Sequence, residues 1–299
     1  MYINKLNTHI VPIRFEYHAP TSVEEAVELL SEYGEAASLL AGGTDLLVNM
    51  KQRVEEPKHI INIKNIKELV GIKEGEDGII IGAATKFRTI ERSKLIIEKL
   101  PLLQEAVRAI GSVQIRNMAT IGGNICNANP CADSATALLA LDGNAKIVGP
   151  KGMRMVSMDE FLVGAGQTIL EPNEMLVEVS TPLLPEDAGT SFIKIGWTSF
   201  DISTVNVAVV LRLEDDVVDD CKIALGACAP TPIRIHKAEE YLQGKKLTDE
   251  TIEAAADIVS QHIKPRKRWR RAPSEYRRAT SKTMTIDALT RAKRRIMKG

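Results

Sequence analysis

A stretch of about twenty residues, 111–131, shows neither helical nor strand periodicity, and it constrains the fold more than any other segment. Its composition is not that of a polar linker, and a long unpatterned segment inside a compact domain usually carries function. It contains Thr120-Ile121-Gly122-Gly123-Asn124, which offers a hydroxyl, two flexible glycines and a side-chain amide. Helical spacing flanks it at 88–110 and 132–141. The sequence therefore predicts a functional loop between two helices.

A second glycine pair, Gly42-Gly43, follows the apolar run 36–41 and precedes helical spacing that begins at Leu46. Glycine lets backbone N–H groups approach an anion at a strand-to-helix turn. A tight turn without a ligand gives the same pattern, so this pair alone leaves both interpretations open. The two glycine segments, with Asp133 nine residues after Asn124, could together supply donors for phosphates and acceptors for sugar hydroxyls. The pattern indicates a dinucleotide site, although the Rossmann fingerprint G-x-G-x-x-G is absent.

The other periodicities predict an α+β chain. Ser22 and Glu25 have the spacing of a capping box at the start of a helix over 22–33. Pro182, Pro185 and Gly189 mark a domain boundary. Strands are expected at 36–41, 59–63, 145–148, 154–157, 175–181, 191–195, 205–213 and 220–228, a hairpin at 71–83, and further helices at 66–70, near 238, at 252–263 and at 272–297. The first sixty-odd residues resemble a small parallel α/β unit, and the segment after the boundary combines a sheet with helices.

The charge of the chain is unevenly distributed. The segment from Lys264 to Gly299 contains fourteen Lys and Arg residues but only two acidic residues, Glu275 and Asp287. This tail therefore carries a net charge of +12, and the rest of the chain carries −12. Such asymmetry is compatible with nucleic-acid or membrane contact, with docking on an acidic partner, or with docking on the chain's own acidic body. Aromatic residues for base stacking are sparse in the tail, with only Trp269 and Tyr276.

Cysteine and histidine patterns predict no metal site and no disulfide framework. Four cysteines in 299 residues form no C-x-x-C pair, which favours a reducing cytoplasm. Cys126 and Cys131 are interpreted as small buried residues, with a redox role left open. The five histidines lack H-x-x-x-H spacing and are interpreted as structural. No apolar run is long enough to suggest a membrane span.

Five sequence motifs resemble those of the FAD-binding medium subunit of the molybdenum hydroxylase family, with the closest likeness to bacterial xanthine dehydrogenase FAD-binding subunits. They are A-G-G-T-D-L at 41–46, I-G-A-A-T at 81–85, Q-I-R-N-M-A-T-I-G-G-N at 114–124, S-F-I-K at 191–194 and A-P-T-P-I-R at 229–234. The resemblance spans nearly the whole chain. It implies a two-subdomain FAD-binding fold of the PCMH (vanillyl-alcohol-oxidase-like) type over 1–186, with subdomains 1–65 and 66–186, and a C-terminal domain of the CO dehydrogenase flavoprotein type over 187–299.

The resemblance also implies which residues bind FAD. The first loop wraps the pyrophosphate, the second closes on it from the other side, and further residues line the flavin. The implied set is Leu39, Leu40, Ala41, Gly42, Gly43, Thr44, Asp45, Leu46, Ile110, Thr120, Gly122, Gly123, Asn124, Asp133, Leu176 and Lys194. The segment 197–205, with Asp201-Ile202-Ser203, resembles a mobile loop near the flavin ring. No residue of this chain is expected to be catalytic, because the cofactor carries the chemistry.

By the same resemblance, the chain is an electron-transfer subunit. It would take electrons from 2Fe-2S clusters on a small partner subunit and pass them to NAD+, while a large subunit with molybdopterin oxidises a purine such as xanthine. A dimer of heterotrimers is the expected assembly. A medium subunit of a carbon monoxide or nicotinate dehydrogenase with another acceptor is an alternative, and a flavin-free scaffold or nucleic-acid module is another. The substrate pocket lies on another subunit, and no additional iron–sulfur cluster is expected in this one.

Overall fold

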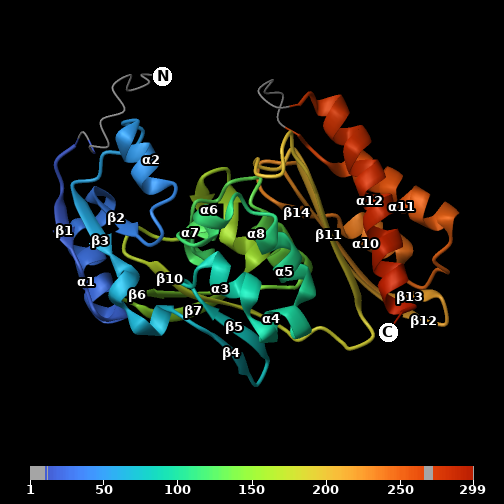
Figure 1. Ribbon diagram of the computed structural model, residues 1–299, viewed down its shortest axis with the longest axis horizontal. Coiled ribbons are helices and arrows are strands. Elements are labelled where there is room, and N and C mark those ends of the chain that lie inside the picture. Colours follow the sequence, from blue (N-terminus) through green and yellow to red (C-terminus); the bar gives the residue numbers. More distant parts are fainter. Residues whose placement is uncertain (1–10, 12, 266–271, 299) are drawn as a thin grey trace.

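The computed structural model describes residue 11, residues 13–265 and residues 272–298. His9 and Trp269 lie outside these ranges. Three parts follow one another along the longest axis of the molecule in Figure 1. A small sheet with α1 and α2 forms the first part, a sheet covered by α3 to α8 forms the second, and a sheet covered by α10 to α12 forms the third. This arrangement confirms the expected α+β class.

The first part is a parallel three-stranded sheet in the order β1-β3-β2. Its elements are β1 (Glu16–His18), α1 (Val23–Tyr33), β2 (Ala37–Leu40), α2 (Leu46–Lys51) and β3 (His59–Asn62), with a 3-10 turn at Gly34–Ala36. The parallel α/β unit is confirmed, although β1 was not predicted. Ser22 caps α1 by accepting from the Glu25 amide at 3.2 Å, but the Glu25 carboxylate accepts from the Thr21 amide at 2.8 Å. The expected capping box is therefore shifted by one residue.

The second part contains an antiparallel sheet in the order β4-β5-β10-β6-β7. Its strands are β4 (Ile72–Gly75), β5 (Gly78–Gly82), β6 (Asn144–Gly149), β7 (Gly152–Ser157) and β10 (Met175–Thr181), and a short pair, β8 (Leu162–Gly164) and β9 (Gln167–Thr168), follows α9 (Met158–Phe161). The hairpin at 71–83 is confirmed. The helix expected at 66–70 is instead a pair of 3-10 turns, Ile63–Asn65 and Lys67–Leu69.

The helix expected over 88–110 is three short helices, α3 (Phe87–Arg92), α4 (Lys94–Lys99) and α5 (Pro101–Arg108). Ser93 caps α4, and Pro101 begins α5 because its ring suits a first turn but not a helix interior. The loop expected at 111–131 contains α6 (Val113–Arg116) and α7 (Ile121–Cys126), so it is not irregular throughout. Gly122 and Gly123 lie in the first turn of α7, where the low helix propensity of glycine concealed the helix.

The third part is an antiparallel sheet in the order β11-β12-β13-β14. Its elements are β11 (Gly189–Ile195), β12 (Val205–Glu214), β13 (Val217–Gly226), β14 (Ile233–Arg234), α10 (His236–Leu242), α11 (Asp249–His262) and α12 (Ser274–Ile296). Side chains alternate along β12: Val207 and Val209 pack with α11 and α12, whereas Ala208 and Val210 pack with the core of the second part. Both faces of this sheet are therefore covered, one by each neighbouring layer.

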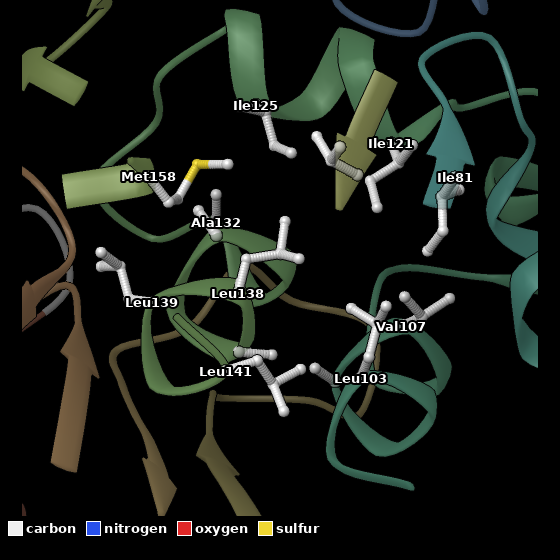
Figure 2. Close-up of a cluster of buried hydrophobic side chains, with 14 of the residues drawn as sticks. Ile81, Leu103, Val107, Ile121, Ile125, Ala132, Leu138, Leu139, Leu141 and Met158 are labelled. Atoms are coloured by element: carbon white, nitrogen blue, oxygen red, sulfur yellow. The ribbon is translucent and has the colours of Figure 1, made fainter. Parts of the chain in front are cut away.

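Helix α8 (Asp133–Ala140) lies at the centre of the larger core. All eight of its residues are buried, and it contacts α5 on one side and the strands β12 and β13 on another. Figure 2 shows Leu138, Leu139 and Leu141 among side chains from α5, α7 and β5. The second and third parts are thereby joined through one continuous apolar core.

The described part of the basic tail includes α12, which is docked on the chain's own body. Arg277 donates to the Ala227 carbonyl at 2.7 Å, Lys282 pairs with Asp257 at 2.7 Å, and Arg295 donates to the Thr190 carbonyl at 2.6 Å. Docking on the chain's own body is one of the alternatives that the uneven charge distribution left open. Within the described ranges, no helix combines the length and the apolar character needed to cross a bilayer.

The position of α8 gives a first prediction. Replacing the fully buried Leu138 with alanine should lower the free energy of unfolding by about 2–5 kcal/mol, because a cavity would form where three elements meet. Denaturant unfolding measures the change. The exposed Leu183 is the matched control, and Leu183→Ala should change stability by no more than about 0.5 kcal/mol. Equal effects of the two substitutions would contradict the central role of α8.

Candidate functional site

A cavity of about 650 Å³ opens between the first two parts of the molecule and the sheet of the third. This volume is within the range of small-molecule and cofactor sites. Fifteen of the sixteen residues expected from the sequence line it: Leu39, Ala41, Gly42, Gly43, Thr44, Asp45, Leu46, Ile110, Thr120, Gly122, Gly123, Asn124, Asp133, Leu176 and Lys194. Leu40 is the exception, because its side chain packs beside Gly43. The fold thus gathers residues that are up to 155 positions apart.

The first loop offers unused backbone donors. Between β2 and α2, the amides of Gly42, Gly43, Thr44 and Asp45 donate no hydrogen bond to any described part of the chain. Gly42, Gly43 and Thr44 are half-buried and Asp45 is exposed, so this run of amides beside the cavity can donate to a ligand with acceptor oxygens. Gly43 adopts a positive φ of 73°, which turns the chain sharply from strand into helix. These features are those of an anion-binding turn.

Gly42 brings the first loop into direct contact with the second glycine segment. A Cβ at Gly42 would lie 2.3 Å from the Met118 carbonyl oxygen and 2.9 Å from the Ala119 Cα. No side chain fits in that space, so backbone meets backbone at this point. The need for glycine at this position therefore comes from packing of the two segments as well as from access to a ligand.

The amides of the second glycine pair are already bonded within the chain. The amides of Ile121, Gly122 and Gly123 are already bonded, to the Thr85 carbonyl at 3.1 Å, the Ala83 carbonyl at 2.8 Å and the Thr120 hydroxyl at 3.2 Å. A Cβ at Gly122 would lie 2.6 Å from the Ala83 Cβ. The pair thus shapes the cavity wall rather than offering free amides. Asn124 accepts from the Ser134 hydroxyl at 2.7 Å, which leaves its NH₂ group as a donor on this wall.

Asp133 lies at the start of α8 and is the centre of a buried polar cluster. The Lys194 ammonium on β11 contacts its Oδ2 at 2.7 Å and donates to the Ala109 carbonyl at 2.8 Å. The Asn206 amide on β12 donates to Oδ1 at 2.6 Å, and the Ser203 hydroxyl donates to the same oxygen. The two carboxylate oxygens therefore have protein donors from the third part of the molecule. Asp133 positions the cavity wall in addition to lining it.

Burial raises the pKa of Asp133, and the Lys194 ammonium together with the Ser203 and Asn206 donors opposes that rise. The Lys194 ammonium and the Asn206 NH₂ group both donate, so the two carboxylate oxygens of Asp133 act as acceptors. At the cavity rim, burial and then the Glu55 carboxylate raise the pKa of Asp45. Burial therefore raises the pKa of an acid at each end of the site. Asp133 is paired with Lys194, whereas Asp45 forms no ion pair with a described residue.

Several contributors were not found from the sequence. Arg116 donates from Nη1 to the Ile110 and Gly111 carbonyls at 2.8 and 2.9 Å, and its Nε contacts Glu91 at 2.9 Å. Burial raises the pKa of Glu91, but hydrogen bonds from Arg116 and Arg88 outweigh it and hold that pKa below the usual value. This ion pair fixes the segment that carries Ile110 into the cavity. A basic residue in an otherwise unpatterned stretch gave too weak a signal to identify it.

Asn206 was also missed, although it interrupts the apolar run of β12 and is fully buried. The available signal was a single Asn side chain within an apolar strand. A buried side-chain amide needs hydrogen-bond partners, so its presence there indicates polar groups nearby. Its Oδ1 accepts from the Thr136 hydroxyl at 2.9 Å, and Gly226 leaves the space that it occupies. Asn206 therefore connects the sheet of the third part to both Asp133 and the interior of α8.

One of the two cysteines at the cavity carries a protonated thiol. Cys126 and Cys131 line the cavity, and Cys126 forms no disulfide. Burial raises the pKa of Cys126 to about 12, so its thiol is protonated at neutral pH. Cys126 is half-buried, and it offers no thiolate for redox chemistry.

The segment between β11 and β12 forms part of the cavity mouth. Phe200, Asp201 and Ile202 line the cavity, and the side chains of Trp197 and Phe200 are 77% and 67% exposed. The Asp201 carboxylate accepts from the Thr198 amide at 3.2 Å, which closes a local turn. Large aromatic side chains therefore stand in solvent beside the opening.

Comparison with known proteins matches this architecture over most of its length. Residues 13–184 match the family model described as the FAD binding domain in molybdopterin dehydrogenase, and residues 197–292 match the CO dehydrogenase flavoprotein C-terminal domain. The chain belongs to the family of FAD-binding medium subunits of the molybdenum hydroxylases. The family resemblance found in the sequence motifs is confirmed. The expected fold class, an FAD-binding domain followed by a CO dehydrogenase flavoprotein C-terminal domain, is also confirmed.

Relatives of this medium subunit include proteins from different enzymes. The carbon monoxide dehydrogenase medium chain of Hydrogenophaga pseudoflava is 38% identical over 283 residues, covering 95% of this chain and 98% of the relative. The xanthine dehydrogenase FAD-binding subunit of Escherichia coli O157:H7 is 38% identical over 279 residues, covering 92% and 95%. A solved structure of the Hydrogenophaga pseudoflava carbon monoxide dehydrogenase superposes with a TM-score of 0.93 at 39% identity, covering 96% of this chain and 99% of that one.

FAD is the cofactor of the medium subunit, and the cavity fits it. The unused amides from Gly42 to Asp45 suit a pyrophosphate, the Asn124 amide and polar groups around it suit hydroxyls, and Ile110 with Leu176 provides apolar surface for a flat ring. Which individual side chains touch FAD, and the boundary between domains at residues 186 and 187, stay predictions of the sequence.

The contact at Gly42 gives a second prediction. Gly42→Ala should weaken FAD binding at least about tenfold, because the new methyl group would separate the first loop from Met118 and Ala119 and displace the unused amides. Flavin retained after gel filtration and a titration of the apoprotein with FAD measure the effect. Gly244→Ala is the control, because Gly244 does not line the cavity; its positive φ of 71° makes the substitution locally strained, but FAD affinity should be unchanged. Full FAD affinity in the Gly42 variant would contradict this account.

The Asp133 cluster gives a third prediction. Lys194→Met should lower the free energy of unfolding by about 3–5 kcal/mol, because the 95%-buried carboxylate loses its counter-charge. Removing the ammonium raises the folded-state pKa of Asp133 further, and a raised pKa means that stability is lost as pH rises through it. The destabilisation should therefore be greater at about pH 8 than at about pH 5. Denaturant unfolding at both pH values measures this.

A double variant provides the control for that measurement. Asp133→Asn combined with Lys194→Met removes both charges, so it should be more stable than Lys194→Met alone at about pH 8 and should lose the pH dependence. Additive losses in the double variant, or a pH-independent loss in Lys194→Met, would show that the ion pair is not the stabilising element.

Proposed function

We propose that this medium subunit is the electron exit of a molybdenum hydroxylase that oxidises a purine such as xanthine, and that NAD+ is its acceptor. The observation that carries the flavin-holding role is one cavity in which the unused amides of the first loop, an apolar surface and an open mouth come together. The chemistry that bound FAD supplies is electron uptake from an iron–sulfur cluster and release of two electrons as a hydride. Membership of the family supports this role for the chain.

The residues of the chain hold and orient the cofactor in this proposal. Amides from Gly42 to Asp45 bind the pyrophosphate, and the wall fixed by Arg116 and Asp133 keeps the ring site in place. No acid–base group of the chain is needed for hydride release, so the absence of a catalytic residue from the expected set is consistent with the role. The segment 197–202 leaves one side of the cavity accessible to an acceptor.

The partners follow from the family. We propose a small subunit with 2Fe-2S clusters and a large subunit with molybdopterin, assembled with this chain as a dimer of heterotrimers. The relative named as a medium chain supports an assembly of subunits of three sizes. Docking of α12 on the chain's own sheet favours this role over the nucleic-acid-binding alternative, because Arg277, Lys282 and Arg295 are engaged internally.

A carbon monoxide dehydrogenase-type complex is the second candidate. It is favoured by the match of residues 197–292 to the CO dehydrogenase flavoprotein model and by the 38% identity to a carbon monoxide dehydrogenase medium chain. The identity to a xanthine dehydrogenase subunit is the same, so overall similarity does not separate the two candidates. Their acceptors differ in chemistry, and the acceptor can be tested on this chain alone.

The test uses the FAD-loaded chain without oxygen. NADH should bleach the visible absorption of oxidised flavin, because hydride transfer between nicotinamide and flavin runs in both directions. Dithionite is the control that shows the flavin to be reducible. Bleaching by dithionite but not by NADH would overturn the NAD assignment and favour the second candidate. A chain that binds no flavin at all would overturn the whole proposal.

The substrate is tested on the complex that co-purifies with the chain. Reduction of its flavin by xanthine, and not by carbon monoxide, is expected. The opposite result would assign the complex to the second candidate.

A further inference from the structure

Three side chains with metal-binding donors meet on the small parallel sheet of the first part, outside the cavity. They are Glu16 and His18 on β1 and His59 on β3, and their donor atoms all lie within 4.8 Å of one another. In the described ranges, no other group of three His, Cys, Asp or Glu side chains has this property. Spacing in the sequence could not reveal the group, because 41 residues separate His18 from His59.

The backbone pairing places these side chains together. Strands β1 and β3 are parallel neighbours, and Glu16 is the direct partner of His59. Residues two apart in a strand share a face, so His18 projects on the same side as Glu16. The cluster is therefore a consequence of sheet register and does not depend on flexible loops.

The distances match those of a tetrahedral metal site. Two ligands at about 2.0–2.1 Å from a tetrahedral Zn²⁺ are about 3.3–3.4 Å apart. His18 Nε2 lies 3.2 Å from His59 Nδ1, and His59 Nδ1 lies 3.5 Å from the Glu16 carboxylate. Both distances are close to one tetrahedral edge, so the ligands need little rearrangement around an ion.

The two imidazole rings are held by an aromatic neighbour. The Tyr33 ring at the end of α1 stacks on His59 with centroids 3.8 Å apart and an angle of 3° between planes, and it stacks on His18 at 5.1 Å. The His59 side chain is only 16% exposed, whereas Glu16 is 73% exposed. Two ligands are thus preorganised, and the third is free to close on an ion from the solvent side.

We propose that Glu16, His18 and His59 bind one divalent transition-metal ion of the Zn²⁺ type, with water in the fourth position, and that the ion fastens β1 to β3. Two imidazoles and a carboxylate form a donor set suited to Zn²⁺. With no ion, the facing ring nitrogens share a proton in an N–H···N hydrogen bond, and the metal takes the place of that proton. The site is structural, because it lies apart from the residues that line the cavity.

The experiment is a calorimetric titration of the full-length, chelator-treated, FAD-loaded chain with Zn²⁺. One equivalent should bind, and the thermal midpoint should rise with Zn²⁺ because the ion binds only the folded sheet. His18→Gln should weaken Zn²⁺ binding at least about tenfold. Glu16→Gln should weaken it in the same direction, and this exposed position tests the site without endangering the fold.

His236→Gln is the matched control, because His236 also pairs with a glutamate, Glu239, but has no third ligand. It should bind Zn²⁺ as the unaltered chain does. A crystal soaked in Zn²⁺ should show anomalous density within about 2.0–2.1 Å of both ring nitrogens. Failure to bind Zn²⁺, or equal binding by the His18 and Glu16 variants and the unaltered chain, would overturn the proposal. FAD content is unaffected by these outcomes, so they are independent of the proposed electron transfer.

Discussion

The architecture of the site depends on backbone segments that approach one another without side chains between them. At Gly42 the first loop touches Met118 and Ala119, and at Gly122 the start of α7 touches Ala83. Each contact is closer than any Cβ would allow, so the glycines decide how near the three segments can come. Because the loop is held by this contact, its unused amides keep a fixed direction before any ligand arrives. Preorganisation of this kind reduces the ordering that binding must otherwise bring about.

A buried charge cluster complements the glycine contacts. Asp133 begins a helix of the second part, but its hydrogen-bond partners Lys194, Ser203 and Asn206 all come from the third. Burial of charges brings a desolvation penalty, so such a cluster contributes less to net stability than to the choice of one arrangement over others. The relative placement of the two layers is therefore specified by polar groups, whereas the apolar core around α8 provides most of the favourable energy.

The sequence predicted much of this structure because strand alternation and glycine turns are local signals. The hairpin at 71–83 and the parallel unit at the start were accessible in that way, whereas the expected cavity residues came from the family resemblance of the motifs. What failed depended on context. Glycine concealed α7, Pro101 and Ser93 divided one expected helix into three, and the roles of Arg116 and Asn206 arise only from partners distant in the sequence. The meeting of His18 and His59 could not be predicted either, because it depends on the register of β1 and β3.

The two-sided burial of β12 also restricts how proteins of this architecture can be taken apart. Separating the chain near the linker would leave one face of a four-stranded sheet, including Phe192, Ala208, Val210 and Ala224, without its helical cover. An uncovered apolar sheet face promotes self-association, so a C-terminal fragment alone should be poorly soluble. Recombination between relatives would likewise have to exchange α8 together with the sheet on which it packs. The two segments matched by separate family models therefore depend on each other for the burial of a shared apolar core.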